Sequence, residues 1–382
     1  SSEFSQAVAA TSRTLSGTIR NDLNANGNVA DDGGAGFAGA TVGLYRDDGD
    51  GVIDAGDAFV TSAVANASGA YTFTGLLADT YYVVVDSKTL AAPAYVGAFG
   101  LADVWADQTY AVAGAANNAL GTTFTAAAGA LYGGRAAGTS DDAATLGTAE
   151  HVVRINLAPA NAANVDAGFS FSAVVNTRGD ATDDDGGGTA RMQQGSLRQF
   201  ILNSNAISGI QTSDFSIGTG AQTITPALNA PLPTITDAVV LDATTQEGYA
   251  GTPLIRLDGS VAGFGYSGLT ITAGGSTVRG FVINLFGQDG IRLSGTGGNT
   301  IAGNYIGTNA AGTAAQGNGG YGISVLSGNG NTLGGAGAGN LVSGNALGGI
   351  SLTGGTGHVV AGNGIGTNLL GMAVPDATGL AA

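Results

Sequence analysis

Five aspartates gather in the segment RDDGDGVIDAGD, which begins at Arg46: Asp47, Asp48, Asp50, Asp54 and Asp57. Carboxylates this close together repel one another by about 1 kcal/mol per pair in water, and by more near a protein surface. A hard cation relieves that repulsion, and aspartate suits the purpose because its short side chain bends easily toward a bound ion. The segment therefore predicts a calcium site.

The spacing of these residues fits the twelve-residue calcium loop, whose ligands stand at positions 1, 3, 5, 7, 9 and 12 around a glycine turn at position 6. If Gly51 makes the turn, Val52 offers its main-chain carbonyl at position 7, and Arg46 falls on position 1. Because a guanidinium cannot bind a cation, Asp47 is the candidate to replace it. The predicted ligands are Asp47, Asp48, Asp50, Val52, Asp54 and Asp57.

A second, less complete loop surrounds Gly27. It matches the first half of the same template but lacks the final glutamate. Both loops also have an alternative interpretation as solvated turns rich in aspartate and asparagine, which a calcium titration would decide. The candidate ligands of this second loop are Asp22, Asn24, Asn26 and Asn28, followed closely by Asp31 and Asp32.

The overall composition limits the partners of the chain. Its 382 residues include 12 basic and 28 acidic side chains, and the net charge of −16 makes nucleic acid and anionic membranes poor partners. Cysteine is absent, which excludes disulfide scaffolds and thiolate metal sites. No segment approaches the ~20 apolar residues of a membrane span. At roughly 100 to 200 residues per domain, the length predicts two domains.

The first domain is predicted to be a β-sandwich over residues 14–172. Short β-rich runs alternate there with glycine and aspartate turns, which is typical of sandwiches. Residues 86–162 are rich in alanine and glycine, and only 105–112 and 151–157 are predicted as strands among them. Residues 1–13 are expected to form a flexible N-terminal segment.

A polar stretch separates this module from the rest of the chain. Residues 173–194 are predicted to be a strand followed by an acidic, glycine-rich linker. Asp183, Asp184 and Asp185 do not have the spacing of metal ligands, which favours a linker over a metal site. Residues 195–206, GSLRQFILNSNA, form the one convincing amphipathic helix and are expected to act as a cap. The second domain then occupies residues 195–382.

Repeats in the second domain predict stacked coils. NTIAGNYIGTN, at 299–309, and HVVAGNGIGTN, at 358–368, share the letters AGN and IGTN. Two aliphatic rows recur at matching intervals and alternate with polar residues, as strands with one buried face do, so we expect rungs about 4.8 Å apart. Glycine and asparagine pairs at the corners are expected to supply positive φ angles. The two rows are Ile291, Ile323 and Ile350, and Ile301, Leu333 and Val360.

Both domains resemble known families. Residues 14–172, with SGTIRNDLNANG, GLYRDDGDGVIDAGDAFV, SGAYTFTGL and NVDAGFSF, resemble the calcium-binding B-type repeats of bacterial serine-aspartate surface adhesins, which implies a transthyretin-like sandwich. From about residue 173, VVNTRGD, QGSLRQFILNSNA and GNYIGTN resemble the right-handed parallel β-helices of large secreted adhesin-like proteins. In that family GSLRQ-type sequences cap the helix, and the array continues for more coils, so we expect the β-helix to be incomplete at its C-terminus.

The resemblance implies a non-enzymatic structural protein of the bacterial cell surface or extracellular matrix, a stalk, fibre or adhesin segment stiffened by Ca²⁺. The expected partners are copies of the chain itself, by strand addition or end-to-end stacking, and surface glycans or other cell-surface proteins. Residues 5–14 are a candidate complementing strand. The alternative is a β-helix protein that binds or cleaves polysaccharide, but cleavage needs grouped carboxylates, or calcium with a basic side chain. No two carboxylates pair in the repeat register among Arg256, Asp258, Arg279, Asp289, Arg292 and Asp376.

Overall fold

The computed structural model describes residues 12–116, 123–135, 142–175 and 195–373. Contacts divide them into two units. The first comprises the described parts of 1–91 and 106–170, and the second comprises residues 92–105 with the described residues from 171 onward. Both are built mainly of strands, with one α-helix in the described ranges, which confirms the predicted all-β class. Most of the predicted linker, including the run from Asp183, lies outside these residues.

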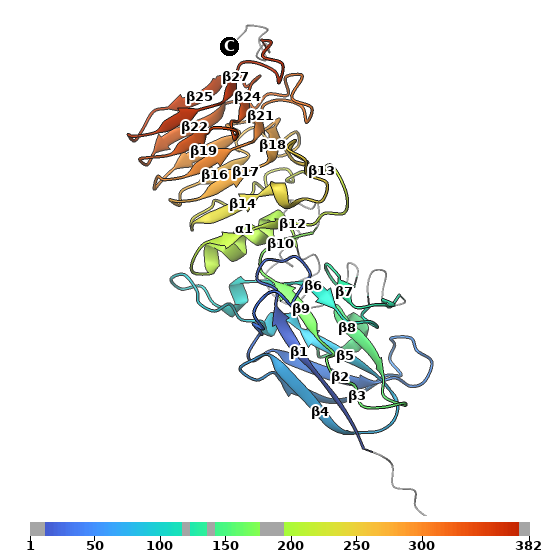
Figure 1. Ribbon diagram of the computed structural model, residues 1–382. Coiled ribbons are helices and arrows are strands. Elements are labelled where there is room, and N and C mark those ends of the chain that lie inside the picture. The colour runs from blue at the N-terminus through green and yellow to red at the C-terminus, as the bar shows by residue number, and fades with distance from the viewer. Residues whose placement is uncertain (1–11, 117–122, 136–141, 176–194, 374–382) are drawn as a thin grey trace, which may run out of the picture. The chain divides into compact units, whose positions relative to one another are not determined.

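The first unit contains two sheets (Figure 1). One has the order β4-β1-β9-β6-β7, and in it β1 and β9 run parallel while the other pairs are antiparallel. Its strands are β1 (Arg13–Asn21), β4 (Ala70–Leu76), β6 (Asp107–Ala111), β7 (Gly129–Ala130) and β9 (Ala167–Ser170). The other sheet has the antiparallel order β3-β2-β5-β8 and contains β2 (Thr41–Arg46), β3 (Ala58–Val64), β5 (Thr80–Asp86) and β8 (His151–Asn156).

The central strands β2 and β5 are buried on both faces. Their sequences, TVGLYR and TYYVVVD, are nearly continuous apolar runs, as expected of strands covered on both sides. On one face, Tyr45, Tyr82 and Val84 pack against the connecting segment that holds Ala143, Leu146 and Ala149. The alanine-rich stretch that gave no clear sequence pattern therefore covers the sheet that carries the acidic loop.

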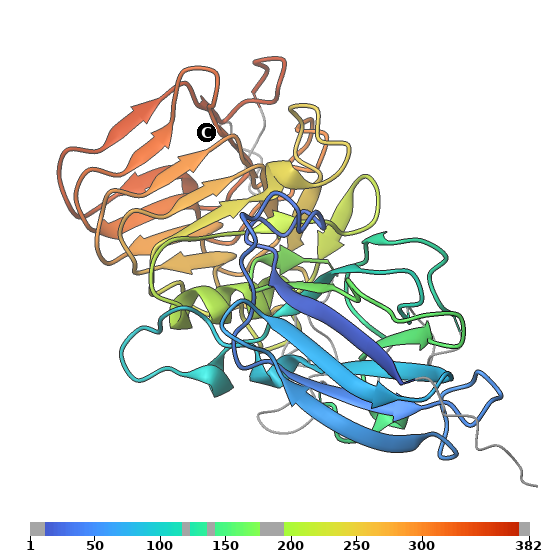
Figure 2. The same cartoon turned by 60° about the horizontal axis from the view of Figure 1, so that its bottom comes forward.

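The second unit contains a two-stranded parallel sheet, β10 (Ala173–Val174) with β12 (Asp214–Phe215), and three longer sheets of parallel strands that the chain visits in turn (Figure 2). The first sheet runs β11 (Gln211–Thr212), β14 (Val239–Asp242), β17 (Thr277–Arg279), β20 (Thr300–Ala302), β23 (Thr332–Gly334) and β26 (Val359–Ala361). The second runs β13 (Gln222–Ile224), β15 (Ile255–Asp258), β18 (Phe281–Asn284), β21 (Tyr305–Ile306), β24 (Leu341–Val342) and β27 (Gly364–Ile365). The third runs β16 (Leu269–Ile271), β19 (Ile291–Ser294), β22 (Tyr321–Ser327) and β25 (Gly348–Leu352).

The predicted aliphatic rows align in these sheets. Ile323 pairs with Ile291 on one side and with Ile350 on the other. Leu333 likewise lies between Ile301 and Val360. This register confirms that matching positions of successive repeats lie on neighbouring strands, with most of their side chains in one apolar core.

Buried asparagines join the same coils. Asn304 Nδ2 donates to Asn340 Oδ1 at 3.0 Å, and Asn340 Nδ2 donates to Asn363 Oδ1 at 2.9 Å. Asn299 donates to Asn331 in the same way in a parallel column. The prediction of positive φ at these corners is confirmed for glycine, since Gly303, Gly344 and Gly362 have φ of 66°, 75° and 70°. It is wrong for the asparagines that follow them, because Asn304, Asn345 and Asn363 do not have positive φ.

Helix α1 (Leu197–Ala206) forms where the sequence predicts it. Ser196 caps it by accepting the Gln199 N–H at 3.0 Å, while Gln199 Oε1 accepts the Gly195 N–H at 2.9 Å. Its apolar side chains Leu197, Phe200 and Ile201 join the core of the second unit. Figure 1 shows α1 next to β14, at the N-terminal end of the stack of strands.

Residues 92–105 pack against this helix, although the sequence analysis gave them to the first module. The Trp105 N–H donates to Asn203 Oδ1 at 2.8 Å, and the Asn203 and Gln199 amides donate back to the Trp105 carbonyl at 2.7 and 3.1 Å. The Val96 N–H also bonds the Ala206 carbonyl at 2.8 Å. A segment early in the chain thus completes the helix end of the second unit.

Candidate metal centre

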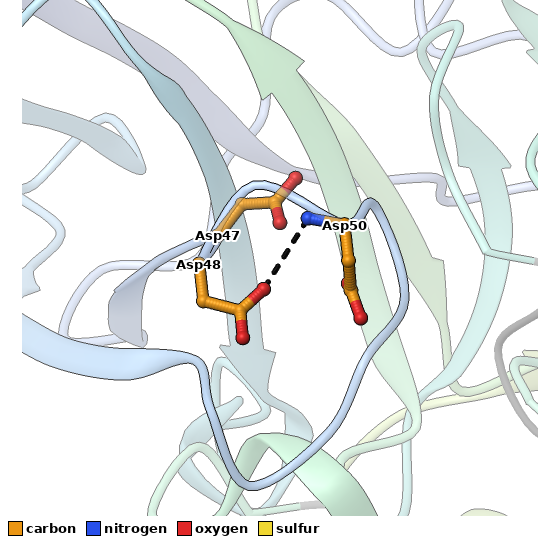
Figure 3. A group of neighbouring side chains, drawn as sticks. All are labelled: Asp47, Asp48 and Asp50. Carbon is orange, nitrogen blue, oxygen red and sulfur yellow. Dashed lines mark hydrogen bonds between the residues drawn. The ribbon is translucent and has the colours of Figure 1, made fainter.

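Three carboxylates converge in the loop that follows β2 (Figure 3). Asp47, Asp48 and Asp50 each have an oxygen within 4.8 Å of the others, which is close enough for one metal ion to bind all three. Asp48 and Asp50 are exposed, whereas Asp47 is buried. The cluster is therefore anchored on one side and open to solvent on the other.

Backbone N–H groups orient these side chains. Asp47 Oδ1 accepts from Gly49 and Gly51 at 2.9 and 3.1 Å, and Asp48 Oδ1 accepts from Asp50 at 3.3 Å. Asp50 Oδ1 accepts from Val52 at 2.7 Å. Each is a local turn that aspartate forms readily. The chain therefore arranges the carboxylates by itself, before any ion binds.

Gly51 occupies the turn, as the loop template requires. Its φ of +76° belongs to the left-handed region, and a Cβ there would lie 2.5 Å from Nη2 of Arg154. Arg46, at template position 1, turns away to pair with Asp79 at 2.6 Å. Asp47 instead accepts the Gly51 N–H, so it is the carboxylate that faces the loop near position 1.

Asp57 closes the loop rather than joining the cluster of three. Its carboxylate accepts the Asp48 and Asp54 N–H groups at 3.3 and 2.9 Å. Asp54 accepts from Gly56 at 2.6 Å. The predicted ligands Asp54 and Asp57 thus lie in the same loop but outside the cluster of Asp47, Asp48 and Asp50. Val52 is exposed, and its carbonyl remains a predicted ligand.

Opposing effects act on the two buried aspartates. Burial alone would raise the pKa of Asp47, but the N–H bonds from Gly49 and Gly51 and the Arg154 guanidinium outweigh it, so this pKa lies below its ordinary value. Burial raises the pKa of Asp57, and the charges of Asp47 and Asp54 add to the rise, although two N–H bonds oppose it. The donors around Asp47 therefore outweigh the effect of its burial on the pKa, whereas those around Asp57 do not.

Two residues from distant strands complete the surroundings, and sequence reasoning missed both. Arg154, from β8, places Nη2 3.3 Å from Asp47 Oδ2 and lies 5.7 Å from the centre of the Phe124 ring. Tyr82, from β5, is fully buried, and its hydroxyl has no hydrogen-bond partner among the described residues. Burial, and then the charges of Asp47 and Asp57, raise the pKa of Tyr82. Only strand pairing brings these residues to the loop.

The earlier loop is built differently. Buried Asp22 accepts the Asn26 and Gly27 N–H groups at 3.2 and 2.8 Å. The Asn26 and Asn28 amides donate to Asp31 Oδ2 at 2.9 and 3.3 Å, so neutral side chains provide hydrogen bonds to a carboxylate of this loop.

Asp32 and Asn24 complete the earlier loop. Asp32 Oδ1 accepts the Leu23 N–H at 2.9 Å, while the buried Oδ2 has no hydrogen-bond partner in the described structure. Burial raises the pKa of Asp32, and the Asp22 and Asp31 charges add to it. Asn24 Oδ1 accepts the Asn26 N–H at 3.2 Å. Within the described ranges, no three carboxylates of this loop converge as they do after β2.

No protein-family model, curated protein or solved structure matches the chain. In the described ranges, no helix is both long and apolar enough to cross a membrane. The site must therefore be interpreted from its own geometry.

Proposed function

We propose that this chain is a non-enzymatic structural protein of the bacterial cell surface or extracellular matrix, a stalk, fibre or adhesin segment that calcium stiffens. In this proposal the first unit is a transthyretin-like sandwich related to the B-type repeats of surface adhesins. The second is a right-handed parallel β-helix. The strand order of the two units, and the in-register pairing of parallel strands within the sheets of the second unit, support these assignments.

The observation that carries the proposal is the convergence of the Asp47, Asp48 and Asp50 carboxylates in one loop. All of the candidate ligands offer oxygen, which calcium prefers, and calcium accepts an irregular arrangement of ligands more readily than magnesium, which needs a strict octahedron. An ion bound there would join β2 to the connection that leads into β3. Binding to the folded state alone then adds directly to stability.

Calorimetric titration tests this proposal. Calcium should bind the full chain, and Asp50→Asn, which keeps the turn but removes one ligand charge, should weaken that binding by at least tenfold. Glu247→Gln removes an exposed charge outside both loops and should leave binding unchanged. Absence of calcium binding to the unsubstituted chain would contradict the proposal.

The ionic contacts of the second unit favour a scaffold over a catalyst. Three of its carboxylates pair with arginines: Asp242 with Arg279, Asp258 with Arg256 at 3.1 Å, and Asp289 with Arg292 at 3.8 Å. Asp289 also accepts the Ser324 hydroxyl at 2.6 Å and the Tyr321 N–H at 2.9 Å. Asp376 lies outside the described residues. Purified protein should therefore not depolymerise acidic polysaccharides, and measurable cleavage would overturn this part.

A second candidate function is glycan binding, and one groove of the second unit favours it. The groove has a volume of about 590 Å³, within the usual range of ligand sites, and none of its lining residues is charged. Tyr249 and Tyr305 line it beside Asn340 and Thr367, so aromatic faces and neutral hydrogen-bonding groups are close together. Retention on a neutral polysaccharide column that Tyr305→Ala abolishes would support it, while equal retention of both proteins would exclude the groove.

Extracellular location and contacts with surface glycans or other cell-surface proteins belong to the same proposal. So does association of the chain with copies of itself. Most of the complementing strand expected at residues 5–14 lies outside the described residues, and Thr14 belongs to β1. End-to-end stacking of the second unit is the other form of association in this proposal.

A further inference from the structure

The third sheet of the second unit carries an arginine, Arg292, that makes no hydrogen bond among the described residues. It lies on β19 between Ile291 and Leu293, whose side chains are buried in the core, so its own side chain points outward. Every other arginine in the described ranges donates at least one hydrogen bond. The Arg292 guanidinium therefore keeps donors that the chain itself does not use.

Asp289 forms an ion pair with Arg292 but leaves these donors available. Asp289 Oδ2 is 3.8 Å from Nη1 of Arg292, which is longer than a hydrogen bond. The Asp289 carboxylate accepts instead from the Ser324 hydroxyl at 2.6 Å and from the Tyr321 N–H at 2.9 Å. Asp289 is buried, whereas the Arg292 side chain is 40% exposed, so the guanidinium can face a ligand from solution while Asp289 stays in the framework.

A cleft surrounds the guanidinium. Arg292 lines a volume of about 400 Å³, within the usual range of ligand sites, between walls from residues 231–234, 265–270 and 288–292. Its described lining contains one cation and no carboxylate. The neutral hydrogen-bonding side chains that face the same cleft include those of Tyr266, Ser267, Thr270 and Gln288. We call this volume the Arg292 cleft.

Framework hydrogen bonds hold the walls of the Arg292 cleft. Arg198 of α1 donates to the Pro231 carbonyl at 2.7 Å, which fixes the first wall. The Gln288 N–H donates to the Tyr266 carbonyl at 3.0 Å and joins the other two walls. Strands β16 and β19 pair in register beneath them. The cleft is therefore formed before any ligand arrives, and binding costs little ordering of the chain.

We propose that the Arg292 cleft binds a hexuronate unit of an acidic polysaccharide, with Arg292 holding the sugar carboxylate. The planar guanidinium matches a carboxylate and makes two parallel hydrogen bonds to it. One guanidinium balances one negative charge, so a carboxylate fits the cleft better than a doubly charged phosphate group. The inference goes beyond the proposed scaffold role, because it assigns a ligand to the second unit without using the calcium loop.

The neutral side chains of the cleft select a sugar over an acidic peptide. Ser267, Thr270 and Gln288 offer donors and acceptors that suit the hydroxyl groups of a sugar, and the Tyr266 ring offers an apolar surface for one face of it. The aliphatic stem of an aspartate or glutamate would leave these polar groups without partners, which costs binding energy. Binding without cleavage agrees with the absence of paired carboxylates from the described lining.

The Arg292 cleft is separate from the groove that Tyr249 and Tyr305 line. The two share no lining residue, and no charged side chain lines that groove among the described residues. The groove is therefore a candidate for neutral sugars and the cleft for acidic ones. Substitutions in one should leave binding to the other unchanged.

Calorimetric titration of the full chain with trisaccharides of galacturonate, glucuronate and mannuronate tests the inference. The buffer is free of calcium, because uronates themselves bind that ion through their oxygens. At least one trisaccharide should bind, and its methyl ester, which has lost the charge, should bind about tenfold more weakly or less. Absence of binding to all three, or equal affinity for the ester, would overturn the inference.

Substitutions of Arg292 show whether its charge and shape are what the ligand recognises. Arg292→Gln should weaken binding by about tenfold or more, and Arg292→Lys should fall between the two because it keeps the charge without the planar fork. Since Arg292 makes no hydrogen bond in the described structure, Arg292→Gln should leave the melting transition of the second unit in place. Equal binding by Arg292→Gln would contradict the proposal.

Two matched variants serve as controls for the same titration. Arg13→Gln removes an identical charge from the first unit, and Tyr305→Ala alters the neutral groove, so both should bind the uronate as the unsubstituted chain does. A triglutamate peptide carries carboxylates without sugar hydroxyls and should bind more weakly than the uronate. Equal or tighter binding of the peptide would assign the cleft to acidic peptides and refute the inference. Calcium binding by the loop after β2 is measured separately, so the two proposals can fail independently.

Discussion

In the loop after β2, like charges gather, whereas at the coil corners of the second unit neutral amides bond to one another. The asparagine columns are complete within the chain. In the loop, Asp47 faces Arg154, while Asp48 and Asp50 are exposed to solvent. If the loop binds calcium as proposed, the first unit should respond to solution conditions that leave the second unit unaffected, and this difference can be tested directly.

The largest expected effect comes from breaking an asparagine column. Asn304→Ala removes the acceptor of the buried Phe281 N–H and the donor to the Val278 carbonyl. At about 1 to 3 kcal/mol for each unsatisfied group, the second unit should lose about 3 kcal/mol or more of its stability in urea unfolding. Asn329→Ala, at an exposed corner of the same unit, should cost far less. Equal losses would show that burial of the amide is not what matters.

Calcium removal should affect the other unit. With calcium at about 100 times its Kd, binding adds about 2.7 kcal/mol, so a chelator should lower the melting transition of the first unit. The transition of the second unit should not move. Differential scanning calorimetry with and without chelator measures both in one sample, and a shared shift would remove the contrast.

A smaller effect should appear when Asp57 loses its charge. Because its folded pKa lies above the ordinary 3.8, protonation stabilises the fold, and this stability is lost as pH rises through the folded pKa. In chelator at neutral pH, Asp57→Asn should therefore stabilise the first unit by about 1 kcal/mol, or about 2 to 4 °C in Tm.

Calcium reverses that advantage, because Asp57→Asn also weakens a predicted ligand. Asp47 acts in the opposite sense: its lowered pKa contributes stability above the ordinary value, which is lost as pH falls through the folded pKa. Thermal melts of the unsubstituted chain and Asp57→Asn between pH 3 and pH 7 compare the two. A lower Tm for Asp57→Asn in chelator at pH 7 would be contrary to expectation.

The smallest effect concerns His358, which ends the column that contains Asn299 and Asn331. Its Nδ1 accepts the Asn331 N–H at 3.3 Å, longer than the 3.0 Å of the Asn299 N–H to Asn331 Oδ1. His358→Asn should continue the column and change stability by only about 0.5 kcal/mol, in the stabilising direction. His358→Leu offers no acceptor and should destabilise. Chemical unfolding ranks the three proteins.

Sequence alone predicted the parts of the fold that depend on local alternation. The isoleucine rows and helix α1 were predictable because each strand and helix has its own period of apolar residues. The spacing around Gly51 also indicated the acidic cluster, since a loop carries its ligands in order. These features require no knowledge of distant contacts.

Features that depend on tertiary contacts were not predictable in this way. Asn304 could be a turn residue or a buried amide, and only stacking on Asn340 decides between them. Arg154 and Tyr82 reach the acidic loop through the pairing of β8 with β5 and of β5 with β2, which no local pattern encodes. Residues 92–105 gave no pattern because their partner, α1, lies about a hundred residues later in the chain.

The placement of residues 92–105 has a consequence for how the protein carries load. The polypeptide leaves the first unit to contribute residues 92–105 to the second, returns to the first, and leaves it again after Ser170. More than one stretch of backbone therefore connects the two units. A force applied to the chain termini would then be shared between these connections and the hydrogen bonds of Trp105, and would not act on one connection alone. A protease that cuts one connection would leave the halves still joined.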